Sequence, residues 1–187
     1  NEYRQFVGYV KDSLARLAME QTIEVEDEHD DYEILDYEEE VDGEAFYDEA
    51  GDQFFYRGSE RYEHRKQWDI RKLEYTYTYV DFQAAANGSY FESNRADYLV
   101  KKTRKIYPDT LVWVRDFTYS YNEPMTRQYY NHPKYDDYPV VGVNWHQANA
   151  FCNWRTRWLN RYWSSQEMPI TEDWRLPTEF EWEFAAR

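Results

Sequence analysis

Regularly spaced apolar positions open the chain and predict a first helix. Apolar side chains recur every three or four residues at Tyr3, Phe6, Val7, Val10, Leu14 and Leu17. This period predicts an amphipathic helix over residues 2–19, with one face toward a core. Asn1 precedes the helix and carries a side chain that is preferred at an N-cap.

A long acidic segment without a clear period follows, over residues 22–67. It contains Gly43, Gly51 and Gly58, and its composition predicts an insert with little secondary structure. Scattered apolar and aromatic side chains argue against full disorder: Tyr32, Ile34, Leu35, Tyr37, Phe46, Tyr47, Phe54, Phe55 and Tyr56. We expect these side chains to anchor the insert, either on the body of the protein or on a partner.

Two later segments have the pattern of strands. Tyrosine and threonine alternate in Leu73–Phe82, and Leu111–Tyr119 is rich in β-branched and aromatic residues. The segment between them, Asp81–Lys101, predicts a helical turn followed by a loop.

The C-terminal part predicts two capped helices. Pro139–Val143 predicts a short strand or an extended run, and Asn144 can cap the helix that follows. Near one face, that helix brings together Trp145, Ala148, Phe151, Cys152 and Leu159. Pro177 favours extended backbone before it, and Thr178 with Glu181 forms the capping-box pattern of the second helix.

The composition is that of a globular protein with a sizeable core. The 187 residues suffice for one domain, and aromatic residues make up 20% of them. The formal net charge of −15 comes from one stretch, because residues 24–52 hold 16 acids and no Lys or Arg. This acidity argues against nucleic-acid binding, since phosphates would be repelled.

The single cysteine, Cys152, bears on both disulfides and catalysis. One cysteine allows no internal disulfide and no cysteine-based metal site. Because Cys152 lies on the apolar face of a predicted helix, we expect it to pack as a small hydrophobic residue. His146 is nearby, but the sequence supports no catalytic Cys/His arrangement, and the remaining histidines are isolated: His29, His64 and His132.

Two sets of acidic residues resemble functional sites, one a calcium loop and the other an acid–base cluster, but the residues support neither interpretation well. The positions of an EF-hand calcium loop are loosely traced by Glu38, Glu40, Asp42, Gly43 and Glu49. Glu38 and Glu40 have longer side chains than the aspartates that such a loop prefers. A solvated acidic surface is therefore favoured over a calcium site. Three further acids, Glu179, Glu181 and Glu183, lie early in a predicted helix, where carboxylates complement the helix dipole.

The given sequence shows neither the pattern of a membrane span nor that of a signal peptide. No apolar run approaches the roughly 20 residues that a span needs, and no signal-peptide pattern is present. The chain starts at Asn1 rather than Met, and it opens and closes on helical patterns. We therefore expect both ends to be cuts in a longer protein.

Two C-terminal segments carry a family resemblance. PVVGVNWHQANAFCNW and RLPTEFEWEFAAR resemble the hallmark segments of the formylglycine-generating-enzyme (sulfatase-modifying factor) domain family. The matching positions are Pro139, Val140, Val143, Trp145, Ala148, Cys152 and Trp154, then Arg175–Glu179, Glu181–Glu183 and Ala185–Arg187. Asn1–Phe6 resembles an early family segment, T-N-x-x-Y-x-x-F.

The resemblance also implies what this sequence does not contain. Oxidase members of the family bind copper with a cysteine pair that lies downstream of the RLPTE helix, and most calcium ligands of the family also follow it. No position here matches a catalytic residue, so we expect no catalytic, cofactor-binding or metal-binding residue within these 187 residues.

The middle of the chain narrows the resemblance to a non-enzymatic branch. NEYRQFVGYVKDSLARL, the YPDTLVWVRDF to VVGVNW stretch and FCNWRTRWLN are most similar to the gliding-motility lipoproteins of the GldK (PorK) type, with GldJ as second choice. The resemblance implies a lipoprotein at the periplasmic face of the outer membrane, anchored through a lipid upstream of Asn1.

The implied function is structural. We expect a ring-forming component of the type IX secretion and gliding-motility machinery, with a partner of the GldN (PorN) type, self-association, and contacts to other outer-membrane components. The alternative is a copper-dependent formylglycine-generating oxidase with its cysteines downstream.

The expected fold is an irregular α+β domain, related in style to C-type-lectin-like folds. Residues 1–187 would form part of that domain, with the acidic insert at about residues 22–67. We expect the acidic insert and the tyrosine-rich connector after residue 124 to carry the function.

Overall fold

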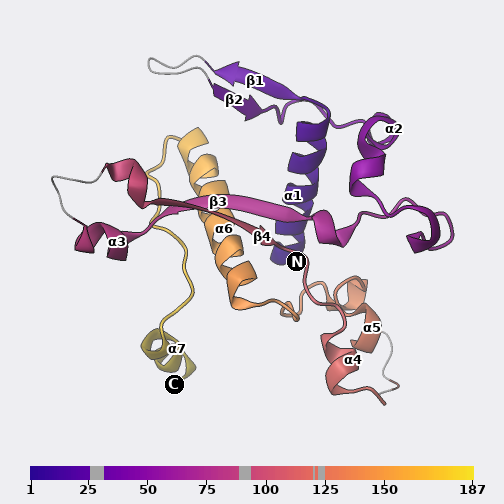
Figure 1. The fold of residues 1–187 in the computed structure, drawn as a ribbon. Coiled ribbons are helices and arrows are strands. Elements are labelled where there is room, and N and C mark those ends of the chain that lie inside the picture. Colours follow the sequence, from indigo (N-terminus) through magenta and orange to yellow (C-terminus); the bar gives the residue numbers. More distant parts are fainter. Residues whose placement is uncertain (26–31, 89–93, 120, 122–124) are drawn as a thin grey trace. The chain divides into compact units, whose positions relative to one another are not determined.

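The chain forms a mixed α+β structure, as the sequence predicts. A computed structural model describes residues 1–187 except 26–31, 89–93, 120 and 122–124. It divides into two compact units, Asn1–Leu73 and Glu74–Arg187. Each unit contains a two-stranded antiparallel sheet together with helices (Figure 1).

The first unit begins with the predicted helix, α1 (Glu2–Ala18). Its buried face includes Phe6 and Val10, whereas Leu17 is 58% exposed although its spacing placed it on that face. Asn1 occupies the N-cap, where its carbonyl oxygen accepts hydrogen bonds from the backbone N–H groups of Arg4 and Gln5. The predicted helix is confirmed.

The acidic insert is more regular than its composition predicts. Strands β1 (Thr22–Val25) and β2 (Tyr32–Leu35) pair antiparallel, and α2 (Gly43–Phe54) follows them. The prediction of little secondary structure is therefore wrong. One cause is Asp42, whose carboxylate accepts from two backbone N–H groups and caps α2.

A small aromatic core explains why α2 is stable. The cluster consists of four buried residues, Ala15, Phe46, Ala50 and Phe55, with Trp68 packed against it. The rings of Phe46 and Trp68 stack with centroids 5.4 Å apart. Within the insert, the aromatic anchors that the sequence indicated thus pack on the first unit itself. Two short 3-10 helices, η1 (Gly58–Glu60) and η2 (Ile70–Lys72), complete this unit.

A buried arginine of α1 binds the backbone of the insert after β2. The Arg16 guanidinium donates to the Asp12 carboxylate at 2.8 Å, and to the carbonyl oxygens of Asp36 and Glu39 at 2.5 and 2.6 Å. Arg16 is only 6% exposed, so these partners offset the cost of burying its charge.

The second unit is built on a β-hairpin. Strand β3 (Glu74–Val80) confirms the first predicted strand, but its partner is β4 (Leu99–Lys105), where the sequence predicted a loop to residue 101. A helical turn between the two strands, predicted from the sequence, is present as α3 (Phe82–Asn87), followed by η3 (Arg95–Tyr98).

The second predicted strand is wrong. Leu111–Tyr119 contains a short helix, α4 (Val112–Asp116), and the Asp109 carboxylate accepts from the backbone N–H of Leu111 just before it. The apolar run 111–114 has four residues, which fit one helical turn as well as a strand, and tertiary context decides between them. Two short elements follow, α5 (Met125–Gln128) and η4 (Pro133–Tyr135).

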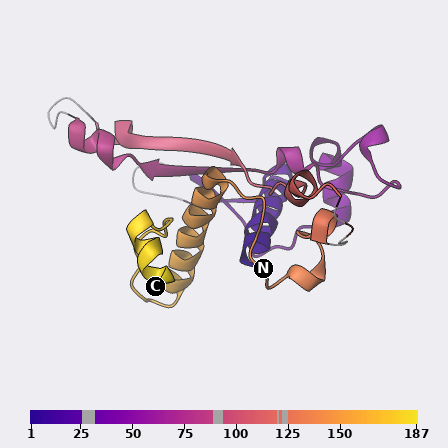
Figure 2. The ribbon, with the colours of Figure 1, turned by 90° about the horizontal axis from the view of Figure 1, so that it is seen from below.

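The two C-terminal helices are confirmed with their caps. Pro139–Val143 is an extended run without strand pairing, and it leads into α6 (Trp145–Ser165). Asn144 and Gln147 form a reciprocal capping box at the start of α6. Helix α6 contacts both strands of the β3–β4 hairpin. It crosses the hairpin in the view of Figure 1 and lies on one side of it in Figure 2.

The buried face of α6 differs from the predicted one. Gln147, Ala150, Trp154 and Thr156 are buried, whereas Trp145 is 65% exposed. Helix α7 (Glu179–Ala186) begins at the predicted Thr178–Glu181 capping box, and every residue in it is exposed. Among the described residues, no helix combines the length and apolar character that crossing a membrane requires.

Candidate binding pocket

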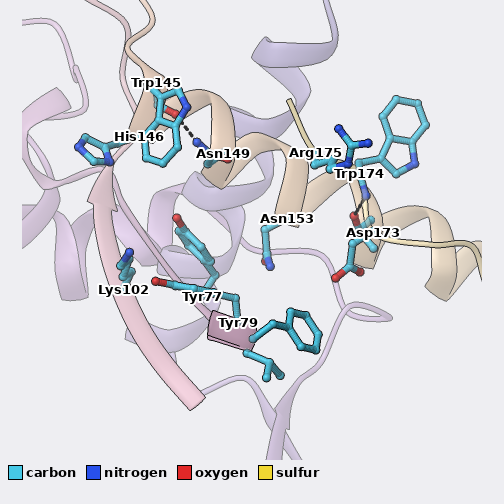
Figure 3. A pocket seen from close by; sticks show the side chains of 13 residues that line it. Tyr77, Tyr79, Lys102, Trp145, His146, Asn149, Asn153, Asp173, Trp174 and Arg175 are labelled. Atoms are coloured by element: carbon cyan, nitrogen blue, oxygen red, sulfur yellow. Dashed lines mark hydrogen bonds between the residues drawn. The ribbon is translucent and has the colours of Figure 1, made fainter. Parts of the chain in front are cut away.

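The described part of the second unit contains a cavity of about 350 Å³. It lies between one face of the β3–β4 hairpin, the N-terminal half of α6 and the extended segment 173–175 (Figure 3). These three walls are formed by segments that are distant in sequence.

The strand wall of the pocket is aromatic. Tyr75, Tyr77 and Tyr79 occupy alternate positions of β3, so they share one face, and their rings follow one another at centroid distances of 5.9 and 6.3 Å. Tyr77 and Tyr79 line the cavity, and Lys102 of β4 adds a cation whose Nζ lies 4.6 Å from the Tyr79 ring centroid. Phe82 extends this wall and is 77% exposed.

The helix wall of the pocket carries two side-chain amides. Asn149 and Asn153 are one helical turn apart on α6, so they lie on the same face. The Asn149 Nδ2 donates to the carbonyl oxygen of Trp145 at 2.8 Å, and the Asn153 Oδ1 accepts from the Tyr75 hydroxyl at 3.3 Å. One end of each amide is thus held by the protein, which leaves the Asn149 oxygen and the Asn153 nitrogen for other partners.

The third wall is fastened to α6 by a short relay of hydrogen bonds. The Thr156 hydroxyl donates to the Cys152 carbonyl oxygen at 3.0 Å and accepts from the backbone N–H of Trp174 at 2.8 Å. This relay places Asp173, Trp174 and Arg175 along the cavity. Trp174 is 49% exposed, so part of its ring surface is open to solvent.

The charges around the pocket are largely balanced. Arg175 binds the Glu181 carboxylate through two hydrogen bonds of 2.7 and 2.6 Å, and this ion pair lowers the pKa of Glu181 to about 2. Asp173 presents a carboxylate at the cavity, and within the described residues it forms neither a hydrogen bond nor an ion pair. The wall therefore offers aromatic surface and neutral hydrogen-bonding groups rather than a concentrated charge.

The only cysteine of the sequence lies outside the cavity lining. Cys152 is half-buried on α6, and burial raises the pKa of its thiol. The structural role expected for it stays a prediction. His146, six residues earlier on α6, lines the pocket.

The other histidines are placed as follows. His64 is exposed, and the Nδ1 of His132 accepts from the backbone N–H of Lys134 at the start of η4. His29 lies outside the described residues.

The calcium loop traced in the sequence does not form. Asp42 is the N-cap of α2, and Gly43 and Glu49 lie within that helix instead of in a loop. Over the described ranges, no three His, Cys, Asp or Glu side chains gather closely enough to hold a metal ion.

The acids of α7 include the cap that the sequence predicted, and the structure adds an ion pair that it did not. Glu181 completes the capping box with Thr178, and Glu183 pairs with Arg187 at 2.6 Å. These contacts account for two of the three acids without any acid–base function.

Sequence reasoning missed the polar residues of the pocket. Asn149, Asn153 and Asp173 carry no motif, and they meet only because α6 packs on the hairpin. The available signal was weak: Tyr75, Tyr77 and Tyr79 alternate along a strand, and two asparagines recur four residues apart on a helix.

Comparisons with known proteins identify a related family. Residues 36–187 match the family described as the sulfatase-modifying factor enzyme 1-like domain. The inactive C-alpha-formylglycine-generating enzyme 2 of Bos taurus is 43% identical over 51 residues, which is 27% of this chain and 11% of the relative. The protein of the same name from Mus musculus is 47% identical over 49 residues, 26% of this chain and 10% of the relative.

The comparisons are limited in extent. The chain spans about a tenth of the length of the curated relatives it matches. No solved structure matches it.

Proposed function

The chain belongs to the sulfatase-modifying factor enzyme 1-like domain family, and on this premise we propose that it is a non-catalytic member that works by binding other molecules. The observation that carries this proposal is the similarity to two relatives that are named inactive. Within this segment, the thiol of Cys152 is half-buried, and burial raises its pKa. A thiol in this setting is poorly suited to act as a nucleophile or a metal ligand.

More specifically, we propose a structural subunit of a ring at the periplasmic face of the outer membrane. The ring would belong to the type IX secretion and gliding-motility machinery, with self-association and a partner of the GldN (PorN) type. The support is the resemblance of the middle segments to GldK-type lipoproteins, together with exposed aromatic residues after α4. Tyr119 is 90% exposed and Tyr121 is 98% exposed, and such residues are enriched at protein interfaces.

The test is the size of the assembly. Full-length protein, alone and mixed with its GldN-type partner, would be passed over a sizing column with multi-angle light scattering. We expect a large oligomer that contains many copies of both chains. A strict monomer that does not bind the partner contradicts the ring proposal.

A matched pair of variants tests whether the exposed tyrosines contribute. The double variant Tyr119→Ser and Tyr121→Ser should lower the assembled fraction, because it removes aromatic contact area. Tyr162→Ser changes an exposed tyrosine on α6 and serves as the control. Equal assembly of the double variant and the control means that these tyrosines lie outside the interface.

The oxidase alternative is tested separately. Full-length protein would be incubated with copper, oxygen, a reductant and a peptide that contains the substrate cysteine, and the peptide analysed by mass spectrometry. We expect the cysteine to remain unchanged. Formation of formylglycine, abolished when cysteines downstream of this segment are replaced, contradicts the non-catalytic assignment.

A further inference from the structure

We propose that the pocket of the second unit binds a neutral saccharide of one or two rings. This site is separate from the proposed ring function and does not rest on it. The proposal follows from the combination of aromatic walls, half-satisfied side-chain amides and balanced charge around the cavity.

The aromatic residues supply surfaces that suit a sugar ring. A pyranose has a face of C–H groups that is apolar, and the flat ring of a tryptophan or tyrosine packs against such a face. Trp145 and Trp174 line the cavity and are 65% and 49% exposed, so their ring surfaces are accessible. Tyr79 offers a third ring on the opposite wall.

The polar groups of the pocket match the hydroxyls of a sugar. Each hydroxyl both donates and accepts hydrogen bonds, so its binding site needs acceptors and donors side by side. The free Asn149 Oδ1 is an acceptor, and the free Asn153 Nδ2 is a donor one helical turn away. Asp173 adds a carboxylate acceptor at the same cavity.

The fixed ends of the two amides matter as much as the free ends. The Trp145 carbonyl oxygen holds the Nδ2 of Asn149, and the Tyr75 hydroxyl holds the Oδ1 of Asn153. These contacts fix which amide atom is left for a ligand. A ligand therefore meets groups that are already oriented, which lowers the entropy lost on binding.

The distribution of charge disfavours phosphorylated ligands. The two hydrogen bonds of Arg175 to Glu181 occupy its guanidinium, and Lys102 lies over the Tyr79 ring. The Asp173 carboxylate at the same cavity would repel a phosphate. The volume of about 350 Å³ is at the lower end of the roughly 300–1,000 Å³ that is usual for ligand pockets, as expected for one or two sugar rings.

The first experiment measures binding directly with named probes. Saturation-transfer NMR on the full chain would use maltose, cellobiose and N,N′-diacetylchitobiose, with glucose 6-phosphate and the peptide Gly-Trp-Gly as competitors of other chemistry. We expect saturable binding of at least one neutral disaccharide. Its affinity should exceed those of the phosphate and the peptide by about tenfold or more.

The second experiment maps the binding to the pocket. Trp174→Ala removes a wall, and Asn153→Asp replaces the amide donor with a carboxylate while keeping an acceptor for the Tyr75 hydroxyl. Each should weaken disaccharide binding about tenfold, the effect of one lost packing surface or hydrogen bond. Trp182→Ala, which removes a tryptophan that is 65% exposed and does not line the cavity, should leave the affinity unchanged. Circular dichroism of each variant checks that the fold is retained.

Three results would overturn the saccharide proposal. One is that none of the three disaccharides binds. Another is that the peptide binds more tightly than every one of the disaccharides. The third is unchanged affinity in folded Trp174→Ala and Asn153→Asp. Light scattering on the same samples separates this test from the test of the ring. If the ring assembles but no sugar binds, only the saccharide proposal is rejected.

Discussion

At the scale of single residues, Gly142 shows how closely two backbone segments approach. Its φ of +79° is a conformation that residues with a side chain rarely adopt. A Cβ placed on Gly142 would lie 2.1 Å from the carbonyl oxygen of Asp109. The backbone N–H of Asp109 donates a hydrogen bond to the Gly142 carbonyl oxygen at 2.8 Å. The extended run before α6 is therefore held against the segment before α4 by a contact that only glycine allows.

This geometry predicts opposite effects for one chemical change at two sites. Gly142→Ala should destabilise the protein by at least about 2 kcal/mol, because it adds both strain and a backbone clash. Gly8 occupies an exposed position of α1, where a Cβ meets nothing within 4 Å, so Gly8→Ala should stabilise the protein by up to about 1 kcal/mol. Urea denaturation followed by circular dichroism measures both changes. Effects of the same sign would contradict the argument.

Residue-scale features were predictable where they are local. Asn144 and the pair Thr178 and Glu181 were identified because a helix cap depends on residues three positions apart. Asn153 and Asp173 were not identified, because their meeting depends on the packing of α6 on a hairpin. Local sequence patterns contain no information about such a meeting.

At the scale of elements, β4 shows why hydrophobic patterning fails for some strands. Its half-buried positions are Val100, Lys102 and Arg104, and the register sets them opposite Tyr79, Tyr77 and Tyr75. Lys102 places its Nζ 4.6 Å from the Tyr79 ring centroid, so a charged sequence forms the partner of an aromatic strand. An alternation of apolar and polar residues is therefore absent from β4.

A pH prediction belongs to α7. The Glu181 carboxylate accepts hydrogen bonds from Arg175 and from the N–H and hydroxyl of Thr178, and its pKa falls from an ordinary 4.5 to about 2. Because the folded state favours the charged form, this contribution is present above pH 4.5 and is lost as the pH falls toward 2. We expect α7 to fray over that range, and NMR titration of the side-chain carboxyl to give a midpoint near 2.

Two variants test the cause of that shift. Arg175→Gln removes the first partner and should raise the midpoint toward 4.5. Arg187→Gln removes the partner of Glu183 instead and should leave the Glu181 midpoint in place. A midpoint that is insensitive to Arg175 would contradict the assigned cause.

At the scale of the whole molecule, the sequence predicted the class of fold better than its organisation. The α+β class is confirmed, and the resemblance to the formylglycine-generating-enzyme family is confirmed over residues 36–187. The division at Leu73 and Glu74 was not predictable, because no composition change marks it. The cluster around Phe46 was also hidden, since its members are scattered through a segment dominated by acids.

The distribution of stability over the molecule can be measured by hydrogen exchange. Phe46→Ala should cost about 3–5 kcal/mol in the first unit, because Phe46 is 3% exposed and contacts three other aromatic rings. We expect the largest loss of amide protection in α2 and the last turn of α1, with smaller changes in α6. Phe180→Ala, at a phenylalanine that is 82% exposed, is the matched control and should change protection little. Equal losses throughout the chain would contradict this localisation.

The strand pairing described earlier has a consequence for the time course of folding. Both described sheets pair strands that are consecutive along the chain, and the caps of α6 and α7 are made by residues within three positions. Joining consecutive elements loses less chain entropy than joining residues far apart in the sequence, so the hairpins and helices can form early. The contact of α6 with β3 joins residues about eighty positions apart, as in the Tyr75–Asn153 hydrogen bond. The slow step of folding in the second unit should therefore be the step that creates the pocket.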